Sequence, residues 1–257
     1  MQSAAGKTEG QPDFFAATHW SVVMTAGDST ADPENSRRAL AQLCETYWPP
    51  LYTYALAQGH SLHDAQDLTQ GFFAYLIERK IYQRAERPRG KFRSFLLVAF
   101  KNFLCDAHDR EIALKRGGTR DFVPFDERKA ATATSLFASR HPTGADALDQ
   151  DRLFERSWAE TLVSSALERV ATAYKAEAKE TLFEQLKNFL TVSATPLPTY
   201  TELAERLGLA ESTVRSQVSR LRARYRALLR EEVRRTVTTD AEVDGELREL
   251  LRVLSAA

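Results

Sequence analysis

The chain has 257 residues, and its 35 Lys+Arg and 35 Asp+Glu give a formal net charge of zero. A chain without net charge is not expected to bind nucleic acid indiscriminately, as a histone does. Two cysteines, Cys44 and Cys105, are too few for a disulfide framework or a four-cysteine zinc site, so we expect both in an apolar core. With no apolar leader and no long apolar run, the expected location is the cytoplasm, without membrane contact.

Helical periodicity dominates the chain and predicts an all-α fold. We expect two small helical domains joined by a linker, the second containing a helix-turn-helix. The predicted parts are an N-terminal extension, a first domain, a linker, a second domain and a C-terminal extension, at residues 1–34, 35–118, 119–151, 152–235 and 236–257.

The first domain begins with an apolar stripe that predicts a helix. Pro49 and Pro50 should interrupt it and begin a second helical piece, because proline lacks the N–H that an inner helical turn needs. Ser61 is a predicted N-cap that starts the next helix. Pro and Gly within residues 86–91 then predict a basic loop before a further helix.

A basic block covers residues 79–120, where twelve Lys and Arg stand against four Asp and Glu, a local charge of +8. Aromatic residues are interleaved with these cations, a pattern typical of single-stranded nucleic acid binding. By periodicity Phe95 and Phe103 belong to the core. Phe92, at the edge of the loop, is the predicted base-stacking residue.

The second domain carries two helices separated by a glycine. Thr199 and Glu202 form a predicted capping box, and Gly208 should end the helix that they begin. Ala204, Gly208 and Val214 have the spacing of a helix-turn-helix, in which a small residue, a left-handed turn and a core anchor follow one another.

The second of these helices should bury one stripe and expose another. The expected buried stripe is Val214, Val218, Leu221, Tyr225 and Leu228. The opposite face carries arginines and serines, which bind base edges and phosphates. Residues 206–235 hold nine Arg and three Glu, a local charge of +6, so this helix is the predicted duplex-DNA reader. A basic face that is merely solvated is the alternative.

Three segments together resemble bacterial RNA polymerase sigma factors of the extracytoplasmic-function (ECF) group. Residues 64–73 resemble the core-polymerase-binding helix, residues 92–102 the promoter-melting segment, and residues 199–226 the reader of the upstream element. Their order and separation match as well. The resemblance covers residues 35–118 and 152–235, and indicates a subgroup with N- and C-terminal extensions.

The resemblance implies a role for each matched position and no catalytic residue, cofactor or metal. The implied partners are the beta-prime clamp and beta flap of core RNA polymerase, promoter DNA, and either an anti-sigma factor or a Ser/Thr kinase. Polymerase contacts fall to Asp64, Asp67 and Gln70. Capture of the melted downstream promoter element falls to Arg87, Arg89, Lys91, Phe92, Arg93, Lys101 and Asn102. Reading of the upstream element falls to Ser212, Thr213, Arg215, Ser216, Ser219 and Arg222.

The polymerase-binding helix departs from the family pattern, since Gln66 and Gly71 stand where acids are common. A phosphate on Thr69 would supply negative charge there, so Thr69 is a candidate phosphorylation site. An unmodified threonine at the helix surface is the other interpretation.

Two other classes compete with a sigma factor. His60, His63 and Asp67 have metal-ligand spacing on one helix face, but no HExxH motif, Gly-rich phosphate loop or nucleophile elbow accompanies them, so we expect no enzyme. A conventional helix-turn-helix regulator that binds duplex DNA as a dimer is the stronger rival. That class gives no reason for the basic and aromatic block.

Overall fold

The computed structural model describes residues 33–84, 91–114, 147–190, 197–237 and 239–255, and its regular structure in these ranges is all helical. The described residues contain eight α-helices and no strand, which confirms the predicted all-helical class. The α-helices are α2 (Pro33–Ala57), α3 (Leu62–Glu78), α4 (Phe92–Leu114), α6 (Ala147–Ala176), α7 (Glu180–Leu186), α8 (Tyr200–Leu207), α9 (Glu211–Thr236) and α10 (Val243–Ser255). Short 3-10 turns add η1 (Ile81–Arg84), η3 (Lys187–Phe189) and η4 (Asp240–Glu242). In this part of the chain no helix has the length and apolar character that a membrane crossing needs.

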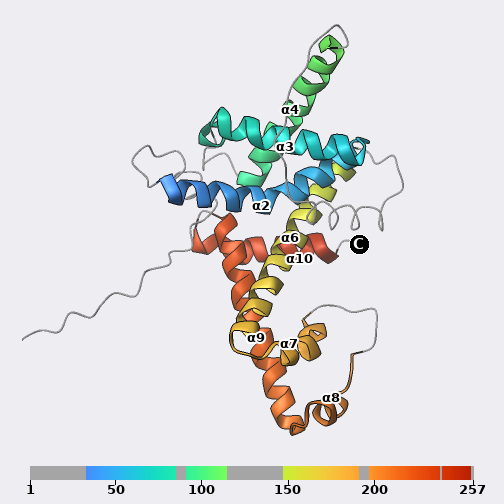
Figure 1. Cartoon of the computed structure of the whole chain (residues 1–257), viewed down its shortest axis with the longest axis vertical. Helices are drawn as coiled ribbons and strands as arrows, with labels where there is room; N and C mark the ends of the chain where they lie inside the picture. The colour runs from blue at the N-terminus through green and yellow to red at the C-terminus, as the bar shows by residue number, and fades with distance from the viewer. Residues whose placement is uncertain (1–32, 85–90, 115–146, 191–196, 238, 256–257) are drawn as a thin grey trace, which may run out of the picture.

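Two long helices, α6 and α9, connect the ends of the molecule (Figure 1). They pack side by side, and at one end α2, α3, α4 and α10 gather around them. At the other end α7 and α8 lie against the remaining turns. Arg169 of α6 reinforces this pairing, because its guanidinium donates to Glu232 at 2.7 Å and to Glu231 at 2.8 Å, both on α9.

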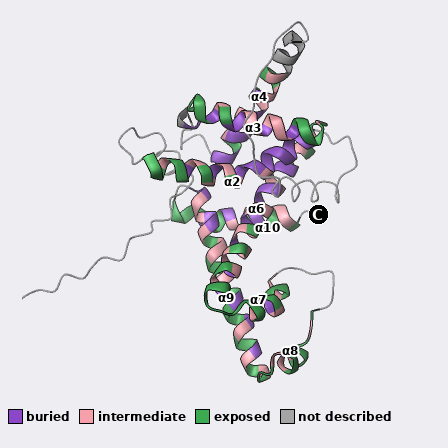
Figure 2. Ribbon diagram, in the orientation of Figure 1, coloured by how far each residue is buried: buried purple, intermediate pink, exposed green. Residues whose placement is uncertain are grey.

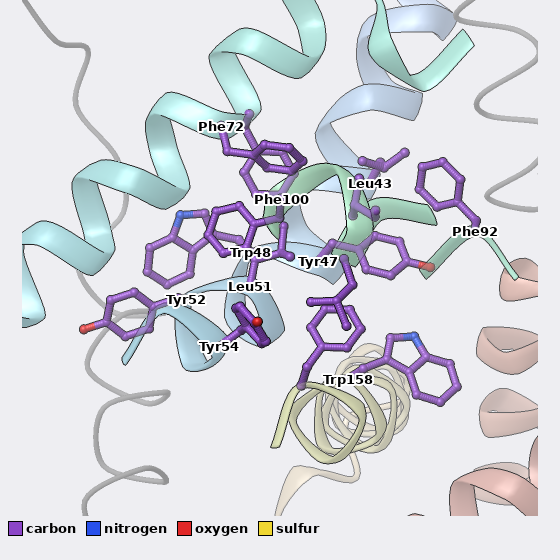
Figure 3. Packing of buried hydrophobic residues seen from close by; sticks show 14 of the residues in the cluster. Leu43, Tyr47, Trp48, Leu51, Tyr52, Tyr54, Phe72, Phe92, Phe100 and Trp158 are labelled. Atoms are coloured by element: carbon purple, nitrogen blue, oxygen red, sulfur yellow. The ribbon is translucent and has the colours of Figure 1, made fainter. Parts of the chain in front are cut away.

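The larger core lies where α2 crosses α6 (Figures 2 and 3). Side chains of α2 lie between those of α3 and α4 on one side and Trp158 of α6 on the other. The aromatic members meet edge-to-face, with ring centroids of Phe72 and Phe100 5.0 Å apart. Its fully buried large side chains are Leu43, Tyr47, Trp48, Leu51, Tyr52, Phe72, Leu76, Phe92, Phe100, Phe154 and Trp158.

Segments far apart in the sequence contribute to this one core. Phe154 and Trp158 fall in the predicted second domain, yet both pack with α2, α3 and α4. The same cluster takes Val233 from the end of α9 and Leu250 from α10. The predicted domain limits stay a prediction, but residues 152–162 stabilise the helices of the first predicted domain.

A smaller core lies between the second half of α6, α7, α8 and the first half of α9. Its buried members are Val170, Tyr174, Phe183, Leu186, Leu203, Val214, Val218 and Leu221. Three of these belong to the buried stripe that the sequence predicts for residues 214–228. Tyr225 and Leu228, the other two of that stripe, are half-buried against the same cluster.

The expected break at Pro49 and Pro50 is wrong, because α2 continues through both prolines. An inner proline costs about 3 kcal/mol or more through a lost hydrogen bond and a ring clash. Here the neighbours Tyr47, Trp48 and Leu51 are all buried, and that burial offsets the cost. The continuous helix presents aromatic side chains on either side of the prolines to one core.

The two cysteines differ from the expectation of a buried pair. Cys44 is half-buried and packs against the larger core, and burial raises the pKa of its thiol to about 11. Cys105 is exposed on α4. Only Cys44 therefore acts as a small core residue.

Both predicted helix starts are capped as the sequence indicates. The Ser61 hydroxyl accepts from the Asp64 amide at 3.1 Å, and Thr199 accepts from the Glu202 amide at 3.2 Å. The Glu202 carboxylate accepts in turn from the Thr199 amide at 2.8 Å, which completes a capping box. These bonds lower the pKa of Glu202. α8 thus begins at Tyr200.

Gly208 makes the turn between α8 and α9. The two helices and this turn, residues 200–236, are called here the α8–α9 corner. Gly208 has a left-handed φ of 64°, and the amide of Leu209 returns to the carbonyl of Ala204 at 3.0 Å. A residue with a Cβ is strained in this conformation even where space is available, as it is here.

Replacing Gly208 by Ala is therefore expected to lower the free energy of unfolding by about 1 kcal/mol. Gly245, which lies in helical backbone on α10 with open space around it, is the matched control. Gly245→Ala should raise the free energy of unfolding by up to about 1 kcal/mol, because it restricts the unfolded chain. Urea denaturation followed by circular dichroism measures both, and two shifts of the same sign would contradict the assignment of the turn.

Candidate nucleic-acid interface

The outer face of α9 is accessible in the α8–α9 corner. The Thr201 hydroxyl of α8 donates to the Glu211 carboxylate at 3.1 Å, which ties the start of α9 to α8. Ala210, the N-cap of α9, offers no side-chain cap, as its sequence predicts. Of the predicted upstream-element residues Thr213 is half-buried, and the others are exposed, namely Ser212, Arg215, Ser216, Ser219 and Arg222.

This face is cationic over most of the helix. Residues 212–230 contain six arginines and no acid. The glutamates of α9 lie at its two ends: Glu211 at the first turn, where it complements the helix dipole, and Glu231 and Glu232 in contact with Arg169. The outer face between them suits an anionic partner.

Two of the predicted DNA-reading arginines are held against aromatic rings. The Arg215 guanidinium lies 5.0 Å from the ring centre of Tyr200 and bonds Glu211 at 2.6 Å, and that bond lowers the pKa of the Glu211 carboxyl. Arg222 lies 6.0 Å from the ring centre of Phe189 and donates to the Phe189 carbonyl at 3.3 Å. Because each guanidinium group lies against an aromatic ring, both are oriented before any ligand binds.

Two further arginines complete the exposed face. Arg220 and Arg226 are exposed, and the structure gives neither an ion-pair partner among the described residues. Arg220 lies one turn from Ser216 on the same face. Arg220 is not among the predicted upstream-element residues, although its spacing of four residues from Ser216 signals a place on that face.

Two predicted strand-binding residues of the basic block, Phe92 and Arg93, lie inside the fold, whereas Arg79 and Lys80 at its start are exposed. Phe92 is fully buried against Tyr47, with ring centroids 5.6 Å apart, so the expectation of an exposed stacking residue is wrong for this conformation. Arg93 is only 4% exposed. Its Nε donates to Glu155 at 2.7 Å, its Nη1 to Glu246, and its guanidinium lies 4.0 Å from the ring centre of Trp158.

Lys91 shares one of these carboxylates. Its Nζ lies 2.8 Å from the other oxygen of Glu246, and partial burial together with Arg93 lowers its pKa. Arg87 and Arg89, the preceding predicted DNA contacts, lie outside the described residues. Lys91 and Arg93 are therefore paired within the chain.

Lys101 is paired as well, and Asn102 is exposed. Asp151 Oδ2 of α6 accepts from Lys101 at 2.9 Å, and the Lys101 ammonium lies 5.5 Å from the ring centre of Tyr54. Partial burial acts to lower the pKa of Lys101, but the bond to Asp151 leaves it raised overall.

The acidic face of α3 is open. Asp64 is exposed, and Asp67 and Gln70 are half-buried on the same side of the helix. His63 lies 3.5 Å from Asp67, an i,i+4 pair at the surface. Within the described ranges no three His, Cys, Asp or Glu side chains gather as a metal site would require.

Thr69, the candidate phosphorylation site, is not at the surface. Its side chain is fully buried, and its hydroxyl donates to the Ala65 carbonyl at 2.7 Å. A phosphate there would place about two negative charges in an apolar environment. The helix-surface interpretation is wrong, and modification would require α3 to leave the core.

No family model, curated protein or solved structure matches this chain. Three features of the described residues bear on its function: an open acidic face on α3, the paired cations Lys91, Arg93 and Lys101, and an open cationic face on α9.

Proposed function

We propose that this chain is a sigma factor of the ECF group with N- and C-terminal extensions. In this proposal it binds core RNA polymerase and directs promoter-specific initiation. The segment of α3 and α4 melts DNA and captures the downstream element, and the α8–α9 corner is a helix-turn-helix that reads the upstream element. The observation that carries the proposal is the outer face of α9, which is exposed and cationic beside a left-handed glycine turn.

The side chains that the first turns of α9 expose support the assignment of this helix as a DNA reader. A recognition helix enters the major groove by its N-terminal residues, whose side chains contact base edges. The first turns of α9 expose Ser212, Ser216 and Ser219 without an apolar neighbour between them on that face. Arg220 follows on the same side and can bind guanine or phosphate.

The open face of α3 supports the polymerase contact. Asp64 and Asp67 present carboxylates beside Leu62, whose side chain is 55% exposed. A single exposed leucine is ordinary on a protein surface, so the support comes from the two carboxylates. A cationic clamp surface is the chemistry that would complement it.

A conventional duplex-DNA regulator is the second candidate. The observation that favours it is the pairing of Lys91, Arg93 and Lys101 within the fold. If those pairs are purely structural, the chain keeps only one DNA-binding surface, and that surface is the α8–α9 corner.

Binding to purified core RNA polymerase separates the two candidates. The proposal predicts a complex in size-exclusion chromatography, and Asp67→Lys should weaken it about tenfold, since it reverses a charge at the contact. Glu184→Lys, a matched reversal on exposed α7, should leave the affinity unchanged. A chain that binds duplex DNA but no polymerase would favour the regulator. Equal polymerase affinities for the two variants would contradict a contact through α3.

A further inference from the structure

All three described cations that the proposal assigns to the melted strand are neutralised by acids from outside α4. Lys91 and Arg93 meet Glu246 of α10, Arg93 also meets Glu155 of α6, and Lys101 meets Asp151 of α6. The partners lie 50 to 155 residues away in the sequence, so these are tertiary contacts. Acids from two helices, α6 and α10, therefore keep these three cations from binding DNA.

α10 is held over the start of α4 by apolar and ionic contacts. Val243 and Leu250 are buried in the larger core, and Asp244 pairs with Arg230 of α9. Glu246 is 4% exposed, and each of its two carboxylate oxygens has a cationic partner. The Glu246 carboxylate binds the same two cations that a DNA phosphate would need to contact.

We propose that α10 and the first turns of α6 form an intramolecular lock on the single-strand-binding surface of α4. The inference rests on the proposed function, because it takes Lys91, Arg93 and Lys101 as the cations that bind the melted strand. In the locked form those cations are paired with the carboxylates of Glu246, Glu155 and Asp151. The C-terminal extension is then a regulatory segment, and its release exposes the surface to DNA.

The chemistry of the lock makes the two states exclusive. A cation contributes to single-strand affinity only when it neutralises a phosphate. Arg93 cannot do so while it is buried on Trp158 and bonded to Glu155 and Glu246. Opening breaks a buried pair and has a cost, so the free chain should bind single strands weakly.

Glu246→Gln in the full chain tests the lock. It removes the charge that holds Lys91 and Arg93 and keeps the size of the side chain. We expect faster amide hydrogen exchange over residues 243–255. Affinity for a short fluorescent single-stranded DNA should rise about tenfold, with a salt dependence steeper by roughly 0.7 for each phosphate newly contacted. Affinity for duplex DNA should stay constant. Glu184→Gln is the matched control, because it makes the same substitution in an exposed local pair on α7, outside the contacts that hold α10.

Unchanged exchange in α10, or unchanged single-strand affinity once α10 is released, would overturn the lock. So would an equal gain for Glu184→Gln. If Glu246→Gln loses its helical circular dichroism, the double variant Asp151→Asn, Glu155→Gln replaces it, since both acids are partly exposed. That variant should also gain single-strand affinity, and no gain would overturn the lock. Core polymerase binding, measured on the same proteins, tests the proposed function separately.

Discussion

Replacing Arg93 by Met is expected to lower the free energy of unfolding by about 3–5 kcal/mol, because it leaves a buried carboxylate without its partner. Glu246 would keep only Lys91, and Glu155 would lose its bond to Arg93 Nε. The aliphatic part of Met refills much of the space over Trp158, so the loss reports charge more than volume. Chemical denaturation with an intrinsic tryptophan signal measures it.

A double variant tests whether the unpaired buried carboxylate causes that loss of stability. Arg93→Met combined with Glu246→Gln removes both charges and should be more stable than Arg93→Met alone, since no uncompensated charge stays buried. Arg156→Met is the control on α6, because Arg156 pairs locally with Glu160 on the same helix. It should cost less than about 1 kcal/mol. A double variant less stable than the single one would contradict the buried-pair account.

Truncating Trp158 to Ala should lower the free energy of unfolding by about 3–5 kcal/mol, the usual loss for a large buried aromatic side chain. Trp158 is fully buried between α6 and α2, beside Arg93. For a chain of this size each kcal/mol lowers the melting temperature by about 2–4 °C. Thermal unfolding by circular dichroism should show a decrease on the order of 10 °C.

The same variant tests whether residues 152–162 support the first helices. Hydrogen exchange should accelerate in α2 and α6 together, because one cluster holds both. Val98→Ala, at a side chain that is 57% exposed on α4, should change stability by less than about 0.5 kcal/mol. Loss of protection in α6 alone would show that α2 is stable without Trp158.

The parts of the fold that the sequence predicts correctly depend on neighbours within one or two turns. The caps at Ser61 and Thr199, the stop at Gly208 and the buried positions Val214 and Val218 all involve residues a few positions apart. Periodicity and capping chemistry determine such features directly.

The parts that the sequence does not predict depend on distant partners. Phe92 and Arg93 read as a loop edge, but Trp158, Glu155 and Glu246 bury them. Thr69 has the residue type of a surface position, yet its place on α3 faces the core. No local pattern indicates these contacts, because they require the path of α6 and α10 over α4.

Run-off transcription with purified core RNA polymerase tests the central claim most directly. Core enzyme with the full chain should transcribe fragments of genomic DNA from the encoding organism, and 5′-end mapping should give discrete starts. Two sequence elements at a fixed separation should precede those starts. The α8–α9 corner would bind the upstream element, and the segment of α3 and α4 would bind the melted downstream element. Removing the chain should abolish the transcripts. Core enzyme that yields no new starts, while the chain alone binds duplex DNA and blocks transcription from it, would contradict the sigma-factor account.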